Sequence, residues 1–233
     1  MRSNYNKLVL FIVEGKSDRV SLEGVVRKIL KEKHSPYFII QSDTTSDNKC
    51  YPDNIHRRMH GFINYELQKR KITLKDIDEI IHIIDLDGTY IEDEKIIEEP
   101  KMYSAMFLKN KVIVYNKERI VDRNIRKRAN IEALLSVSSI AKVNYRLYYF
   151  SINLEHVLHN NPNVVSVREK IYLSNSFDDD NADNPEQFLA LINYKDIKHF
   201  KNYKESWEYA RDSNNALNRA SNVCFALEKY AKL

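Results

Sequence analysis

The chain has 233 residues, of which 43% are hydrophobic and 30% are charged, and this composition suits one packed domain with or without an appendage. Its net charge of +4 neither requires nor excludes a nucleic-acid partner. Cys50 and Cys224 lie far apart and outside any CxxC pattern, which argues against a disulfide scaffold and a zinc site. No apolar run approaches the ~18 residues of a membrane span, so we expect a soluble, cytoplasmic protein without a membrane partner.

The first half of the chain alternates between strand-like and helix-like segments. A short apolar run at 7–13 predicts a buried strand, and the apolar stripe after it predicts a helix to about residue 33. Further along, we expect a strand at 37–40, a polar loop at 41–53, a helix at 55–69 and a strand at 79–84.

The second half begins with a charged stretch at 89–104 that predicts a loop with a helical turn. After it we expect a strand at 111–115, a helix at 117–136, a strand at 145–151, a short helix at 154–158, an acidic loop at 174–185 and helix from 188 onward. Buried strands that alternate with helices indicate an α/β fold with a mainly parallel sheet, flanked by helices. We expect an α/β domain at 1–155 with an insertion at about 89–142, and a mostly helical C-terminal appendage at 156–233.

Two acidic motifs directly follow predicted strands. They are Glu14-Gly15-Lys16-Ser17-Asp18 and Asp85-Leu86-Asp87-Gly88. Ligands of an open parallel sheet bind at the carboxyl ends of its strands, and alternate residues of an extended chain point the same way. Three carboxylates without Cys or His form an oxygen-only site that suits Mg²⁺ or Mn²⁺. The alternative is that both motifs are only turns, one of them with a helix cap.

The two motifs together resemble the TOPRIM domain of topoisomerases, primases and OLD-type nucleases, over roughly residues 7–90 and on to the strand at 145–151. Within that family the chain looks most like the small bacterial nucleases related to OLD and RloB, which are linked to phage defence. The resemblance implies Glu14 as general acid or base, and a magnesium or manganese site formed by Glu14, Asp85 and Asp87. It implies supporting roles in the turns for Gly15, Lys16, Ser17, Asp18 and Gly88.

A further cluster of polar residues follows the strand that ends near residue 150. Ser151, Asn153 and Glu155 resemble a Ser-Asn…Glu cluster of the RloB-like proteins, which implies Glu155 as ligand of a second ion and Asn153 as its support. The alternative is that Asn153 caps a helix and Glu155 lies in the first turn, where an acid interacts well with the helix dipole.

The stretch Asp85-Leu86-Asp87-Gly88-Thr89 also matches the signature loop of haloacid-dehalogenase-like phosphatases. In that interpretation Asp85 is the phosphorylated nucleophile and Asp87 the acid or base. Two strand-like segments precede the loop instead of one, and the later lysine and paired-acid motifs are not found. The phosphatase interpretation also leaves Glu14 without a role.

Positive charge concentrates on the helix predicted at 117–136. Its basic residues are Lys117, Arg119, Arg123, Arg126, Lys127 and Arg128. Arg119, Arg123 and Arg126 follow helical spacing and share a face, so we predict that this helix binds the phosphates of nucleic acid. The alternative is a solvated face that pairs with the many acids of the chain.

We therefore expect a nuclease that depends on Mg²⁺ or Mn²⁺ and hydrolyses phosphodiester bonds of DNA or RNA. The alternatives are a binding module for nucleic acid or nucleotides with little cleavage, and the phosphatase. No GxxxxGK[ST] motif occurs, so any ATPase motor would be a separate chain. A homo-oligomer stays open as an alternative to a monomer.

Overall fold

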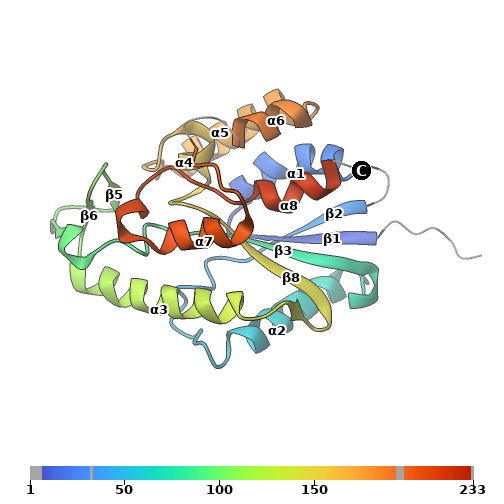
Figure 1. Ribbon diagram of the computed structural model, residues 1–233, viewed down its shortest axis with the longest axis horizontal. Coiled ribbons are helices and arrows are strands. Elements are labelled where there is room, and N and C mark those ends of the chain that lie inside the picture. Colours follow the sequence, from blue (N-terminus) through green and yellow to red (C-terminus); the bar gives the residue numbers. More distant parts are fainter. Residues whose placement is uncertain (1–6, 32–33, 193–196, 232–233) are drawn as a thin grey trace, which may run out of the picture.

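A five-stranded sheet forms the centre of the molecule. The computed structural model describes residues 7–31, 34–192 and 197–231 (Figure 1). The strand order is β2-β1-β3-β8-β7, with bounds β1 (Lys7–Val13), β2 (His34–Ile40), β3 (Ile77–Asp85), β7 (Ser139–Ile140) and β8 (Val143–Phe150). Strands β2, β1, β3 and β8 pair with one another in parallel, and β7 is antiparallel to β8. The expectation of an α/β fold with a mainly parallel sheet flanked by helices is confirmed.

Helices cover both faces of this sheet (Figure 1). One face carries α1 (Lys16–Leu30), α4 (Leu154–His159), α5 (Val167–Asn181), α6 (Pro185–Ile192) and α8 (Cys224–Ala231). The other carries α2 (Ile55–Lys69), α3 (Lys117–Leu135) and α7 (Tyr203–Arg211). In β1, Leu10 and Ile12 pack on the α2 side, whereas Val9 and Phe11 pack on the α1 side. Because both faces are covered, the strand is apolar throughout.

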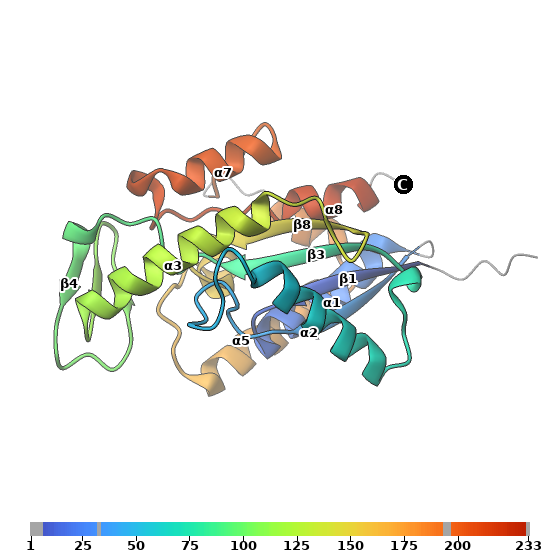
Figure 2. The ribbon, with the colours of Figure 1, turned by 90° about the horizontal axis from the view of Figure 1, so that it is seen from below.

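A second, three-stranded sheet lies beyond the N-terminal end of α3 (Figure 2). Its strands are β4 (Ile96–Glu98), β5 (Met106–Phe107) and β6 (Val112–Val114), in the order β4-β6-β5. The charged stretch at 89–104 contains the expected helical turn, as the 3₁₀ turn Asp93–Lys95, and in addition the strand β4, which was not expected. Since β6 runs directly into α3, the small sheet and the basic end of that helix are neighbours in the fold.

The C-terminal region differs from its prediction in two places. The expected acidic loop at 174–185 is mostly helix α5, which buries Phe177 and Asn181 against the rest of the protein and exposes Asp179 and Asp180. The single helix expected from 188 is instead α6, α7, the 3₁₀ turn Ser213–Asn215 and α8; residues 193–196 and 232–233 lie outside the described residues. Extended chain between the last two elements pairs Ser221 with Phe150 at the end of β8.

The C-terminal helices share a buried cluster with the first helix and the sheet. Helix α5 approaches α1 so closely that a Cβ on Gly24 would lie 2.4 Å from Asp178 Oδ1. The division into two domains near residue 155 stays a prediction. No helix within the described ranges is long and apolar enough to cross a membrane, and both cysteines are free and buried.

The loop after β3 contains a backbone feature that depends on glycine. Gly88 has φ +65°, and a Cβ there would lie 3.0 Å from Leu217 Cδ2. We expect Gly88→Ala to lower the free energy of unfolding by about 1–2 kcal/mol, measured by urea denaturation. Gly61 is the control, since it lies inside α2 with nothing within 4 Å of a Cβ; Gly61→Ala should stabilise by about 0.5–1 kcal/mol. An unchanged midpoint for Gly88→Ala would show that the loop does not need this conformation.

Candidate acidic site at the carboxyl edge of the sheet

Glu14 and Asp85 lie side by side where two neighbouring parallel strands end. Glu14 is the first residue after β1, Asp85 is the last residue of β3, and these strands pair directly. The backbone N–H of Asp85 donates to Oε1 of Glu14 at 3.2 Å. The topology thus brings together two acids that are 71 residues apart in the sequence.

Burial raises the pKa of both carboxyls well above their usual range. For Glu14 the next contributions are Lys127, which lowers the pKa, and then Asp43, Asp87 and Asp18, which raise it. For Asp85 the largest contribution after burial is Glu14 itself. Like charges in one partly buried place disfavour double ionisation, so this pair favours a shared proton or a bound cation.

Asp87 faces a buried ammonium group. Lys127 in α3 is 0% exposed, and its Nζ lies 2.6 Å from Asp87 Oδ2 and 2.9 Å from Asp43 Oδ2. Although burial favours the neutral amine, the two carboxylates raise the pKa of Lys127, so it stays charged. The prediction that Lys127 binds nucleic-acid phosphates is therefore wrong, because its ammonium is enclosed by carboxylates that the fold itself supplies.

Asp43 is a member of this site that sequence reasoning missed. It lies in the loop after β2, where Oδ1 accepts hydrogen bonds from the Thr45 N–H at 3.0 Å and the Thr45 hydroxyl at 2.6 Å. Ser46 donates to the same carboxylate from its N–H and its hydroxyl. Burial alone would raise the pKa of Asp43, but Lys127 and these hydroxyls hold it well below its usual range. An acid followed by Thr-Thr-Ser after a strand was the available signal.

The first turn of α1 is organised by Asp18. The backbone N–H of Gly15 donates to Asp18 Oδ2 at 2.8 Å, and Asp18 is only 8% exposed. The pKa of Asp18 is raised to about 6. Burial is the largest cause, the Gly15 N–H lowers the pKa, and the neighbouring Glu155 contributes to raising it. Gly15 has φ −132°, which any residue adopts, while Lys16 is exposed and Ser17 half-buried.

Asn153 caps helix α4, as the alternative interpretation expects. Its Oδ1 accepts the His156 N–H at 2.8 Å, and its Nδ2 donates to the Pro162 carbonyl at 2.9 Å. Glu155 lies in the first turn with its side chain 5% exposed, and its Oε1 is 3.4 Å from Lys170 Nζ. Glu155 thus already pairs with the ammonium group of Lys170, and its role as ligand of a second metal ion stays a prediction.

The acids of the site fit magnesium as a pair and not as the predicted trio. Within the described part of the chain, no group of three or more His, Cys, Asp or Glu side chains is arranged to hold a metal ion. Magnesium is commonly held by one or two carboxylates, with water and phosphate oxygens completing its shell. Glu14 and Asp85 offer such oxygen-only ligands, and their raised pKa values show that a cation between them would be favoured, whereas Asp87 already pairs with Lys127.

The remaining basic residues of α3 occupy two kinds of position. Arg128 donates to the Thr89 carbonyl at 3.1 Å and so ties the helix to the loop after β3. Lys117 begins the helix, and its backbone N–H donates to Glu98 Oε2 at 2.8 Å. Arg119, Arg123 and Arg126 line one open groove of about 370 Å³ beside the small sheet. Arg123 also donates to the Asp87 carbonyl at 3.0 Å, which links this groove to the acidic site.

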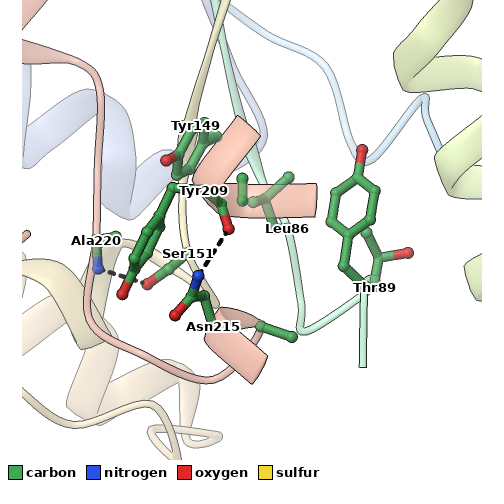
Figure 3. A pocket seen from close by; sticks show the side chains of 10 residues that line it. Leu86, Thr89, Tyr149, Ser151, Tyr209, Asn215 and Ala220 are labelled. Atoms are coloured by element: carbon green, nitrogen blue, oxygen red, sulfur yellow. Dashed lines mark hydrogen bonds between the residues drawn. The ribbon is translucent and has the colours of Figure 1, made fainter. Parts of the chain in front are cut away.

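The loop that carries Asp87 is supported from behind by the C-terminal segment (Figure 3). Leu86 and Thr89 line a cavity of about 10 Å³ together with Tyr149, Tyr209 and Asn215, and this volume is of the order of a single water. Here the Ala220 N–H donates to Ser151 Oγ at 3.1 Å. This packing fixes the loop but leaves no room for a ligand.

Comparison with protein-family models, with curated proteins and with solved structures finds no match to this chain.

Lys127 gives a direct test of the ion-pair network. We expect Lys127→Met to lower the free energy of unfolding by about 3 kcal/mol, because Asp43 and Asp87 lose their shared partner. Lys117→Met on the same helix is the control and should change stability by less than about 0.5 kcal/mol. Adding Asp87→Asn to Lys127→Met should restore part of the loss. A Lys127→Met protein as stable as wild type in urea denaturation would contradict the network.

The raised pKa of Asp18 predicts that the free energy of unfolding depends on pH. Its folded pKa of about 6 lies above the unfolded value, so the folded state holds the proton more tightly. The contribution of Asp18 to stability is greatest below the unfolded pKa and is lost as pH rises through about 6. Between about pH 4 and about pH 7, the stability difference between Asp18→Asn and wild type should shift in favour of the variant by about 2–3 kcal/mol. Urea titrations at both pH values measure it, and a constant difference would contradict the shift.

Proposed function

We propose that this chain is a metal-dependent nuclease of the TOPRIM type that hydrolyses phosphodiester bonds of DNA or RNA. The observation that carries the proposal is the contact of Glu14 with Asp85 at the carboxyl ends of two neighbouring parallel strands. This is the place where open α/β sheets bind ligands. Two acids with raised pKa values beside an arginine-lined groove suit a reaction on a polyanion, because the acids activate water and the arginines hold phosphate.

Magnesium or manganese bound by Glu14 and Asp85 would supply charge neutralisation for the phosphoryl oxygens. The residues of the chain do the rest. Arg123 holds a phosphate near the loop of Asp87, and Lys127 keeps that loop in place through Asp87. The oxygen of water bonds to phosphorus while the bond to the leaving sugar oxygen breaks. Glu14 accepts the proton from water, and solvent protonates the leaving oxygen.

A binding module with little cleavage is a second candidate, and one observation favours it. The part of the chain that the structure describes contains no preformed group of three ligands for an ion. Binding through the arginines needs no ion, whereas hydrolysis by this site does. Metal-supported turnover therefore separates the two candidates.

The phosphatase interpretation needs Asp87 as an acid or base beside Asp85. Its Oδ2 lies 2.6 Å from the Lys127 ammonium, so this carboxylate is already engaged in an ion pair that the fold itself supplies. Glu14 lies next to Asp85 and has no role in that chemistry. We therefore favour the nuclease.

The wider setting of the proposal rests on the resemblance to the OLD and RloB-like nucleases. It includes a role in defence against phage, a separate ATPase chain as partner and a homo-oligomer as the assembled form.

Substitution of the paired acids tests the nuclease. We expect Asp85→Asn and Glu14→Gln each to reduce cleavage of DNA or RNA at least about 100-fold with Mg²⁺ or Mn²⁺. Neither variant should lose stability, because each removes like-charge repulsion. Asp53→Asn, an exposed acid before α2, is the matched control and should cleave as wild type does. Full activity of either site variant would contradict the proposal, and rapid hydrolysis of a phosphate monoester that Glu14→Gln leaves unchanged would support the phosphatase.

A further inference from the structure

We propose that the groove beside α3 binds single-stranded nucleic acid, so that unpaired strands are the substrate class of the adjacent site. The groove is lined by Arg119, Arg123, Arg126, Tyr103 and Tyr115, among others. The inference rests on the proposed function in one respect only, the statement that the bound strand is a substrate. Binding itself requires neither metal nor cleavage.

The positive charge of the groove is arranged in a row, and among the described residues only Arg123 of these arginines has an ion pair, with its Nη1 3.9 Å from Asp87 Oδ2. Arg119, Arg123 and Arg126 follow one another along α3 and span about 10 Å of helix, enough for roughly three phosphates of a strand. Of the described residues that line the groove, none is acidic. No hydrogen bond or ion pair joins the Arg119 guanidinium to another described residue. A polyanion is therefore the complementary ligand.

Two tyrosines add flat apolar surface to the same groove. Tyr103 is fully exposed, and Tyr115 is 63% exposed. Large aromatic rings left in water beside arginines are typical of sites where unpaired bases stack. In a duplex the faces of the bases are covered by their neighbours, so these rings can stack only on a strand whose bases are free. The tyrosines thus favour single strands over duplexes.

The size and the position of the groove agree with a single strand as the ligand. A volume of about 370 Å³ is in the range of sites that enclose one small molecule, and it can take an unpaired nucleotide but not a double helix. Arg123 belongs to the groove and also donates to the Asp87 carbonyl at 3.0 Å. A strand that lies in the groove is therefore next to the loop between Asp85 and Gly88.

The test is a binding titration of the full chain by fluorescence anisotropy without divalent metal. The probes are labelled oligothymidine and oligouridine of about 12 nucleotides and a blunt DNA duplex, at about 50 to about 200 mM salt. We expect either single strand to bind at least about tenfold more tightly than the duplex. Tyr103→Ala should weaken this binding about tenfold, whereas Tyr103→Phe should retain it. The salt slope, which is the change of log affinity with log salt concentration, should be unchanged in Tyr103→Ala. Arg119→Ala should lower the salt slope by about one.

Tyr172→Ala is the control, since Tyr172 is an exposed tyrosine on α5 and should have no effect. Duplex binding as tight as single-strand binding, or wild-type affinity of Tyr103→Ala, would overturn the inference. Asp85→Asn should bind single strands as wild type does, so its loss of cleavage reports only on the nuclease. Binding of single strands with no cleavage under any metal would overturn the proposed nuclease but leave the proposed single-strand binding supported. Cleavage restricted to duplexes would support the nuclease and overturn single strands as its substrate class.

Discussion

The buried ammonium of Lys127 is the constraint on which the site depends. It joins three segments, the loop after β2 through Asp43, the loop after β3 through Asp87, and helix α3. A buried charge is tolerated only where opposite charges surround it, and here the carboxylates of Asp43 and Asp87 do so. Since removing one partner leaves the others uncompensated, the three segments hold one another in a single arrangement. Asp85 is the last residue of β3 and directly precedes the loop of Asp87, so this arrangement also positions the end of β3.

One lysine does not balance the acids that surround it. Glu14 interacts with Asp18, Asp43 and Asp87, and Asp85 interacts with Glu14, Asp18 and Asp87. The cations nearest these acids are Lys127 and Arg123, together with Lys170 beside Asp18. Glu14 and Asp85, which form no ion pair with a described residue, have strongly raised pKa values. The excess is thus localised at the edge of the sheet beside the arginine-lined groove, where a proton, an ion or both can reduce it.

The sequence predicted the four parallel strands of the large sheet and the meeting of Glu14 with Asp85, but it did not predict β4, β5 and β7 or the groups that surround the two acids. Apolar runs identify β1 and β3 because both faces are covered, and parallel pairing then brings their ends together. Lys127 was assigned to the surface by its charge, although it shares a helical stripe with Ile131 and Leu134. The buried face of α3 includes the polar residues Lys127 and Asn130 because it packs on the loop at 41–54, where Asn130 donates to the Thr45 and Cys50 carbonyls at 2.9 Å. Contacts between distant loops leave no periodic pattern, so spacing alone could not reveal Asp43.

The packing of the segment from Tyr209 to Ala220 behind the loop of Asp87 has a consequence for biosynthesis. The acids come from the first 87 residues, but the wall that supports their loop is translated more than a hundred residues later. A nascent chain that has only just left the ribosome with its strands formed still lacks that support. The acidic site is therefore fully supported only after the chain has been translated to about residue 220.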